Sequence, residues 1–329
     1  MKKIRMAFFA LATLALLATS TACGGGGGGG SDDDVVTPVA ENGGAGGSGS
    51  GSSGSGGGST STSIPEGFVH VQGATFNGTT AITGSKVFIS GRTITIPNLL
   101  VCDHEVTQAE YQSVMGANPS YFSGTNKPVE TVSWYDAIMY CNRRSDGEGR
   151  TSCYKVNGNA DTSQWGYTPR AGNSISGSIT CDFAANGYRL PTEAEWEYLA
   201  RGGNLTNSGQ TTYSGSDTIG SVAWYRENAS DVGSSSPDYG THPVKTKAKN
   251  ALNLYDMSGN VWEWCWDWSK GSISTSTPSA GAASGSYRVG RGASWNGLAS
   301  GCTVSYRNDY NPNNRSYVSG FRVVCSRSE

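Results

Sequence analysis

The side chains of this chain that could carry metal or acid–base chemistry are its cysteines, its three histidines and its carboxylates. The histidines, His70, His104 and His242, are scattered and lack the i, i+4 spacing of a helical His-Glu-x-x-His metal site. No Ser/His/Asp or Cys/His arrangement follows from spacing, and the acidic residues are too dispersed to nominate an acid–base pair. Each histidine is therefore expected to be an ordinary surface or core residue, and spacing alone nominates no catalytic site.

The composition of residues 297–319 points instead to binding. This stretch contains no Lys, Glu, Gln, Met or Trp, although all five occur elsewhere in the chain. An Asn codon of the AAC type, randomised at its two adenines, cannot encode those five residues. The pattern therefore suggests a deliberately varied surface on a fixed scaffold. The alternative is a glycine- and asparagine-rich loop in a chain that is poor in long charged residues.

The first residues are typical of an export signal. Lys2, Lys3 and Arg5 precede an apolar run, Met6–Leu17, that is too short to span a bilayer comfortably. Small residues then lead to Cys23, which predicts a lipoprotein signal peptide at 1–22 and a lipid anchor on Cys23. Ser20 stands where such signals usually have Leu, and the alternative is a plain secretory signal with an incidental cysteine. The Gly/Ser-rich residues 23–63 cannot bury apolar area and are expected to form a flexible tether. The protein is therefore expected to be exported and held on a membrane, on the outer membrane or cell surface.

The rest of the chain, 64–329, is long enough for one domain. A net charge of −2 and a pI of about 6.0 lack the excess of basic residues that is typical of nucleic-acid-binding proteins. Setting Cys23 aside, the chain's eight cysteines leave seven, an odd number. Cys153 and Cys181 flank a polar stretch and are the pair predicted to form a disulfide in an exported domain. At least one other thiol then stays free.

Few regular elements are predicted. Ser/Thr-x-x-Asp/Glu spacings predict helix starts at Thr107, Ser133 and Thr192. Short strands are expected at Phe68–Val71, Lys86–Ser90, Thr93–Ile96 and Phe321–Val324. Few helices and short strands separated by glycine-rich connections indicate a loop-rich α+β fold.

Five ordered blocks of sequence resemble the formylglycine-generating, or sulfatase-modifying, family. They are Val132-Ser-Trp-Tyr-Asp-Ala137, Tyr188-Arg-Leu-Pro-Thr-Glu-Ala-Glu-Trp-Glu-Tyr198, Leu254-Tyr-Asp-Met-Ser-Gly-Asn-Val-Trp-Glu-Trp264, Arg291-Gly-Ala-Ser-Trp295 and Gly320-Phe-Arg-Val-Val324. The resemblance covers nearly all of 64–329 and implies a C-type-lectin-like fold.

The resemblance also implies a copper site that this chain matches only in part. The family's founding activity oxidises a substrate cysteine to formylglycine with a copper ion held by two thiolates. Counted from Ser294, the two cysteine positions are occupied here by Gly297 and Cys302. Because soft Cu(I) needs both sulfurs, the chain is expected not to be an enzyme. The alternative function is a copper oxidase that acts on peptide cysteine.

No cofactor is expected to be required, but the resemblance implies a structural calcium ion. The matching ligands are the carboxylates of Asp256 and Glu263 and the carbonyls of Gly259 and Val261, since calcium prefers oxygen. The alternative is that the two carboxylates only hydrogen-bond neighbouring backbone amides.

Within the family, the chain is similar to variable proteins whose C-terminal segments are diversified by retroelements, a lipoprotein type known in spirochaetes (Treponema). This similarity implies a variable region at about 291–324, held by a frame that includes Arg291, Arg307, Pro312, Arg315 and Gly320. The varied, ligand-binding positions are then Gly297, Leu298, Ser300, Gly301, Tyr306, Asn308, Asp309, Tyr310, Asn313, Ser316, Tyr317, Val318 and Ser319. The tyrosines are expected to be the strongest contacts, because tyrosine supplies amphipathic area at low entropic cost. The expected ligand is a protein or glycan on another cell, phage or host surface, bound by a monomer.

Overall fold

In the computed structural model the chain divides into two units, Met1–Ser59 and Thr60–Glu329. The structure describes residues 64–327 apart from 81, 83 and 207. The predicted signal peptide, Cys23 and the tether at 23–63 lie outside the described residues. Within the described part of the chain, no helix combines the length and apolar character that a membrane crossing requires.

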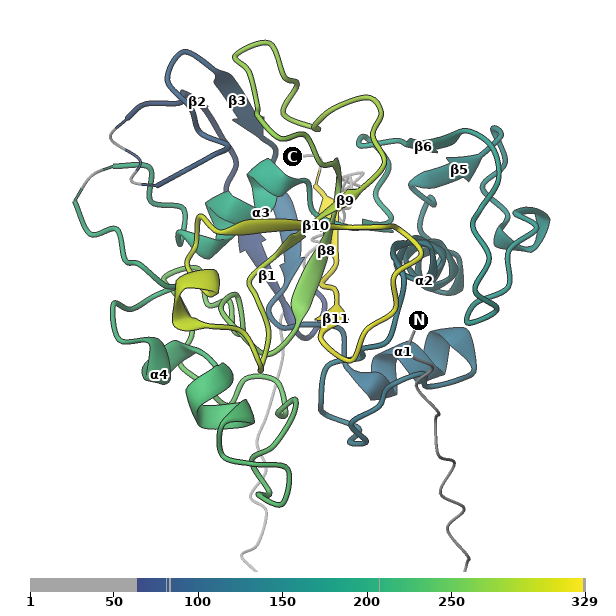
Figure 1. The fold of residues 1–329 in the computed structure, drawn as a ribbon. Coiled ribbons are helices and arrows are strands. Elements are labelled where there is room, and N and C mark those ends of the chain that lie inside the picture. Colours follow the sequence, from purple (N-terminus) through teal and green to yellow (C-terminus); the bar gives the residue numbers. More distant parts are fainter. Residues whose placement is uncertain (1–63, 81, 83, 207, 328–329) are drawn as a thin grey trace, which may run out of the picture. The chain divides into compact units, whose positions relative to one another are not determined.

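Two four-stranded sheets organise the domain (Figure 1). The first has the order β1-β4-β12-β7 and consists of Phe68–Val71, Leu99–Cys102, Val324–Ser326 and Tyr188–Arg189. The second has the order β10-β9-β8-β11 and consists of Arg307–Tyr310, Arg288–Arg291, Trp262–Trp268 and Ser319–Gly320. Two further pairs are β2 with β3 (Ala74–Asn77, Thr93–Ile96) and β5 with β6 (Tyr154–Val156, Ile179–Cys181). The C-terminal residues thus supply strands to both large sheets.

The helices begin where the sequence predicts. Thr107, Ser133 and Thr192 are the N-caps of α1 (Gln108–Met115), α2 (Trp134–Gly147) and α3 (Glu193–Ala200). Each start is a complete capping box, in which the hydroxyl and the carboxylate three residues later satisfy each other's exposed backbone amides. The short α4 (Ile219–Val222), the π-turn Arg226–Ser230 and the 3-10 turns Thr162–Gln164 and Ala299–Gly301 complete the helical elements of the described residues.

The central strand β4 packs both of its faces against apolar clusters. Along β4, Leu99 and Val101 pack into the apolar cluster that contains α3, whereas Leu100 and Cys102 pack into the cluster that contains α1 and α2. Side chains alternate across a strand, so this alternation places helices on opposite sides of the sheet. A central sheet covered on both faces gives the C-terminal residues a rigid support.

Two of the predicted strands need correction. Phe68–Val71 and Thr93–Ile96 are confirmed as β1 and β3. Lys86–Ser90 is not a strand, because the side chain of Ser85 accepts hydrogen bonds from the amides of Val87 and Phe88 and holds a turn there. The last strand lies at Val324–Ser326 rather than Phe321–Val324, where it pairs with β4 and β7.

The predicted disulfide is also wrong. Cys153 and Cys181 are free thiols, as are the other cysteines of the described residues. In the β5–β6 pair, Cys181 lies opposite Tyr154, one residue past Cys153. Cys153 precedes β5 and its carbonyl accepts the amide of Asp182, so the two cysteines are not directly opposite each other.

A fully buried ion pair links the segment between β11 and β12 to β8. The guanidinium of Arg322 donates to both carboxylate oxygens of Glu263 over 2.6 and 2.7 Å, and neither side chain is exposed. Trp196 of α3 donates to the same carboxylate over 2.7 Å. The partners of the Glu263 carboxylate, Arg322 and Trp196, are therefore both distant from it in the sequence.

We expect Arg322→Leu to cost about 3–5 kcal/mol of unfolding free energy, because it leaves Glu263 buried without a counter-charge. Urea denaturation at pH 7 measures the loss. The matched control is Arg150→Leu, which breaks an ion pair with Glu148 whose side chains are 23% and 40% exposed. That change is expected to cost only about 0–1 kcal/mol. Equal losses in the two variants would contradict this account of the buried pair.

Candidate functional site

The C-terminal segment, residues 291–324, leaves the second sheet at β10 and returns to it at β11 (Figure 1, yellow). β10 is an outer strand that pairs with β9 on one side, and β11 pairs with β8 on the far side of the sheet. Between them, residues 311–318 form a loop without regular structure. Such a loop keeps one shape only if other groups bind its backbone and its framework side chains.

Two arginines of the segment are bound by carboxylates of helix N-termini. Arg307 donates to both oxygens of Glu193, the first residue of α3, over 2.7 and 2.9 Å. Arg315 donates to Asp136 in the first turn of α2 over 2.9 Å and to the hydroxyl of Tyr167 over 2.6 Å. Both carboxylates are buried. The segment is thus fixed to two helices by charge-assisted hydrogen bonds, which are stronger than neutral ones.

Arg291 supplies a third anchor at the start of the segment. Its buried guanidinium donates to the carboxylate of Glu197 and to the carbonyl of Tyr306, and it lies 4.9 Å from the ring centroid of Trp196. The sequence placed these arginines in the frame without naming their partners. The structure supplies the acidic partners on α2 and α3.

The backbone of the loop is held as well. The carbonyls of Pro312 and Ser316 accept the amides of Trp134 and Thr131, each over 3.0 Å. Gly320 is required for space rather than for an unusual backbone angle, because a Cβ there would lie 2.4 Å from the carbonyl oxygen of Val129. Gly320 therefore belongs to the frame because a side chain would not fit there.

The predicted variable positions lie on the surface in almost every case. Exposed or half-buried are Gly297, Leu298, Ser300, Gly301, Tyr306, Asn308, Asp309, Tyr310, Asn313, Ser316, Tyr317 and Val318. Ser319 is the exception, because it is buried as the first residue of β11, opposite Trp262. All of the predicted variable positions except Ser319 therefore have the exposure that a varied surface requires.

The exposed tyrosines stand in aromatic surroundings. Tyr317 is 45% exposed, and its ring centroid lies 5.9 Å from both Tyr121 and Trp295. Tyr306 is 43% exposed and lies 6.1 Å from Trp262. Tyr121, itself 73% exposed, was not among the predicted site residues, since it lies far upstream of the segment. The candidate face therefore extends beyond the segment.

Tyr310 differs from the other two tyrosines. It packs against Trp262 and Trp264 at centroid distances of 5.8 and 5.9 Å, and burial raises the pKa of its hydroxyl to about 12. Tyr310 therefore contributes to the core as well as to the surface. The side chain of Tyr310 is therefore not available solely for contact with a ligand.

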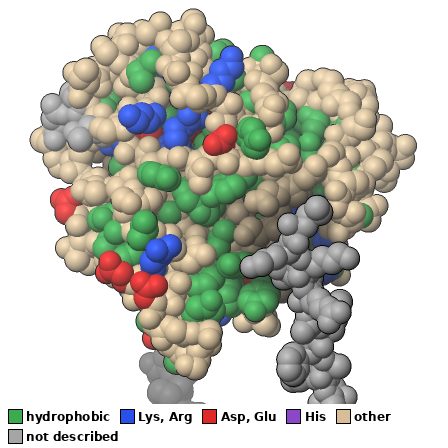
Figure 2. All heavy atoms as spheres, viewed as in Figure 1, with side chains coloured by type: hydrophobic (Ala, Val, Ile, Leu, Met, Phe, Trp, Pro, Cys, Tyr) green, Lys and Arg blue, Asp and Glu red, His purple; other side chains and the backbone are tan. Residues whose placement is uncertain are grey.

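A hollow of about 720 Å³ opens beside β10. Its lining includes Arg307, Asn308 and Asp309 of the segment together with the exposed Lys86, Lys270 and Tyr287. A neighbouring hollow of about 540 Å³ shares Tyr287 and Asp309. Figure 2 shows Lys and Arg side chains gathered near acidic ones on this face, next to a wide area of hydrophobic side chains. The face thus offers both charged and aromatic contacts.

The residues at the two copper positions do not fit a two-thiolate site. Gly297 has no sulfur, and a Cβ there would lie 3.1 Å from the carbonyl oxygen of Ser294. Burial raises the pKa of the Cys302 thiol to about 12, so this group is protonated at neutral pH. Only a thiolate ligates the metal, and no step of copper chemistry follows from these residues.

The predicted calcium ligands are engaged by protein donors. Both oxygens of Glu263 are bonded to Arg322, and Asp256 accepts the backbone amide of Lys245 over 2.8 Å. Asp256 is buried, and burial raises the pKa of its carboxyl to about 6. The guanidinium of Arg322 therefore already balances the charge of Glu263. The calcium site stays a prediction.

Comparison with known proteins identifies the fold. The model of the FGE-sulfatase family, described as a sulfatase-modifying factor enzyme 1-like domain, matches residues 58–327. "Chaperone protein LppX" of Paenibacillus barcinonensis is 35% identical over 81% of this chain and 92% of that protein. The formylglycine-generating enzyme of Streptomyces coelicolor is 35% identical over 67% of this chain and 59% of the enzyme. The solved structure of Treponema denticola variable protein 1 aligns with a TM-score of 0.66 and 36% identity, over 79% of this chain and 95% of its own. The predicted α+β, loop-rich fold of the formylglycine-generating type is confirmed.

We expect added calcium to leave the melting temperature of the metal-free chain unchanged, because Arg322 already neutralises Glu263. Scanning calorimetry of the full chain after dialysis against EDTA, with and without added Ca²⁺, measures this. A rise in the melting temperature on addition of calcium would overturn the expectation and support the calcium site.

Proposed function

We propose that this chain, which belongs to the family of sulfatase-modifying factor enzyme 1-like domains, binds a macromolecular ligand and catalyses no reaction. The observation that carries the proposal is the separation of roles within residues 291–324. The framework arginines are paired with buried carboxylates, while all but one of the predicted variable positions reach solvent. Exposed side chains on a bonded framework can differ from copy to copy without changing the fold.

The chemistry of the face suits a protein or a glycan. Tyr306 and Tyr317 offer large, partly exposed rings with hydroxyl groups, as in antibody paratopes. The hollow beside β10 adds two exposed lysines, Lys86 and Lys270, for acidic groups of the ligand. Binding energy is expected to concentrate in the aromatic contacts, because interface energy is usually carried by a few such residues.

Display on a membrane is part of the proposal and rests on the sequence. The lipid anchor on Cys23, the tether at 23–63 and export to the outer membrane or cell surface would present the domain to other cells, phages or hosts. Diversification by a retroelement would leave a reverse transcriptase and a near-copy of the C-terminal coding segment, differing at adenines, beside the gene. Sister copies that are identical across 297–319 would count against a varied site.

A second candidate function is the holding of unfolded polypeptide on the same face. It is favoured by the similarity to a protein named as a chaperone and by the exposed rings of Tyr121 and Tyr317. An assay with heat-denatured citrate synthase distinguishes the two candidates. We expect that an equimolar amount of the full chain does not suppress the aggregation of citrate synthase. Suppression of that aggregation, lost in the Tyr121→Ser variant, would favour the second candidate.

We expect Tyr317→Ala and Tyr306→Ala each to weaken ligand binding about tenfold or more, because a central aromatic contact contributes roughly 1–2 kcal/mol. Binding of the labelled chain to glycan arrays and to intact cells measures the effect. The melting temperature should change little, since Tyr317 and Tyr306 are 45% and 43% exposed and lie outside the apolar clusters of the core. Tyr310→Ala should instead lower stability, because this ring packs on Trp262 and Trp264.

The matched control is Val232→Ala, an exposed apolar residue outside the C-terminal segment, which should leave binding unchanged. Unchanged binding in both tyrosine variants would place the ligand elsewhere. A large loss of stability in Tyr317→Ala would show that this ring belongs to the framework.

A further inference from the structure

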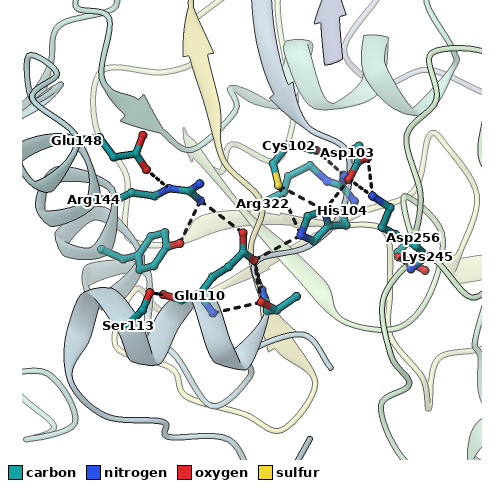
Figure 3. Close-up of polar contacts among 12 residues, drawn as sticks. Cys102, Asp103, His104, Glu110, Ser113, Arg144, Glu148, Lys245, Asp256 and Arg322 are labelled. Carbon is teal, nitrogen blue, oxygen red and sulfur yellow. Dashed lines mark hydrogen bonds and ion pairs between the residues drawn. The ribbon is translucent and has the colours of Figure 1, made fainter. Parts of the chain in front are cut away.

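Three side chains with metal-binding atoms meet at the end of β4, and none of them is among the predicted site residues. Cys102 is the last residue of β4, His104 follows two residues later, and Glu110 lies in the first turn of α1 (Figure 3). The sulfur, a ring nitrogen and a carboxylate oxygen of these residues all lie within 4.8 Å of one another. We propose that Cys102, His104 and Glu110 bind a divalent transition-metal ion, with zinc as the best fit.

The spacing of the three ligand atoms is close to that of a four-coordinate zinc site. The Nε2 atom of His104 lies 3.4 Å from an oxygen of Glu110 and 4.0 Å from the sulfur of Cys102. With Zn–S of about 2.3 Å and Zn–N and Zn–O of about 2.0–2.2 Å, ligand atoms in a tetrahedral site lie roughly 3.3–3.7 Å apart. Small side-chain movements therefore complete the geometry, and the fourth position is left for water.

The neighbours of His104 are those that a metal-bound histidine needs. Its Nδ1 atom lies 2.5 Å from a carboxylate oxygen of Asp103, which leaves Nε2 for the metal. Lys245 in turn donates to both oxygens of Asp103 over 2.9 and 2.7 Å. A carboxylate on the second nitrogen fixes the tautomer and the ring orientation of ligating histidines. The cluster thus has an outer shell as well as ligands.

The types of ligand select the metal. A thiolate excludes calcium and magnesium, which require oxygen ligands, and the set of sulfur, nitrogen and oxygen suits zinc and its chemical relatives. Cys102 is buried while His104 and Glu110 are only partly covered, so an ion has access from solvent. Sequence spacing did not single out this group, because Glu110 is brought to Cys102 and His104 by the turn between β4 and α1.

In the metal-free chain the same groups form a network of ion pairs. His104 lies within hydrogen-bonding or ion-pair distance of Asp103 and Glu110. An oxygen of Glu110 also accepts the amide and hydroxyl of Thr107 as part of the helix cap. The metal therefore shares Glu110 with the cap, and because thiol and imidazole ligands bind in their deprotonated forms, binding releases protons.

The experiment is a titration of the full chain, freed of metal with EDTA and dialysed, with Co²⁺ as a spectroscopic probe for zinc. We expect one equivalent to produce a sulfur-to-cobalt charge-transfer band and the intense visible bands of a four-coordinate site, both removed by Zn²⁺. Cys102→Ser should abolish the charge-transfer band. The control Cys325→Ser, another buried cysteine of the same sheet, should retain it.

A second variant keeps the test decisive if Cys102→Ser does not fold. Asp103→Asn leaves all three ligands in place and should weaken cobalt binding about 10–100-fold, as loss of a histidine's carboxylate partner does. Absence of the bands in the unaltered chain, their survival in a folded Cys102→Ser variant, or unchanged affinity in Asp103→Asn would overturn the proposal.

Discussion

The structure depends on the pairing of arginines near the C-terminus with carboxylates that lie far away in the sequence. Arg307 and Arg315 bind acidic residues in the first turns of α3 and α2, and Arg322 binds Glu263 in β8. Each pair fixes one point of an irregular chain to a regular element. An unpaired charge at these buried places would cost several kcal/mol, so the arrangement has few alternatives. The loop obtains a definite shape without helices or strands of its own.

This arrangement separates the residues that determine the fold from those that meet a ligand. The framework side chains of Arg291, Arg307 and Arg315 are paired with buried carboxylates. The side chains between them reach solvent and bond little to the rest of the domain. Such a division suits a surface whose composition changes, because surface substitutions usually alter stability by only about 0.5 kcal/mol. Tyr310 and Ser319 are the exceptions, since both are packed against β8 or its aromatic residues.

Local signals predicted much of this architecture. The three capping boxes, β1 and β3 follow from short-range spacing, and ordered motifs gave the family and the fold. The partners of the arginines could not be read in this way, because Glu193 and Asp136 lie 114 and 179 residues from Arg307 and Arg315. The pairing register that separates Cys153 from Cys181 and the meeting of Cys102 with Glu110 are likewise products of tertiary packing. Tyr121 joins the candidate face for the same reason.

The most direct test of the account is hydrogen exchange in a chain whose exposed positions are changed together. The substitutions are Leu298→Ser, Tyr306→Ser, Asp309→Ser and Tyr317→Ser. The reporters are the amides of Thr131 and Trp134, which donate to carbonyls of the loop. If the arginine pairs alone hold the loop, both amides keep the protection that they have in the unaltered chain. Loss of their protection to the level found in Arg315→Ala would show that the exposed side chains shape the loop, and would contradict the account.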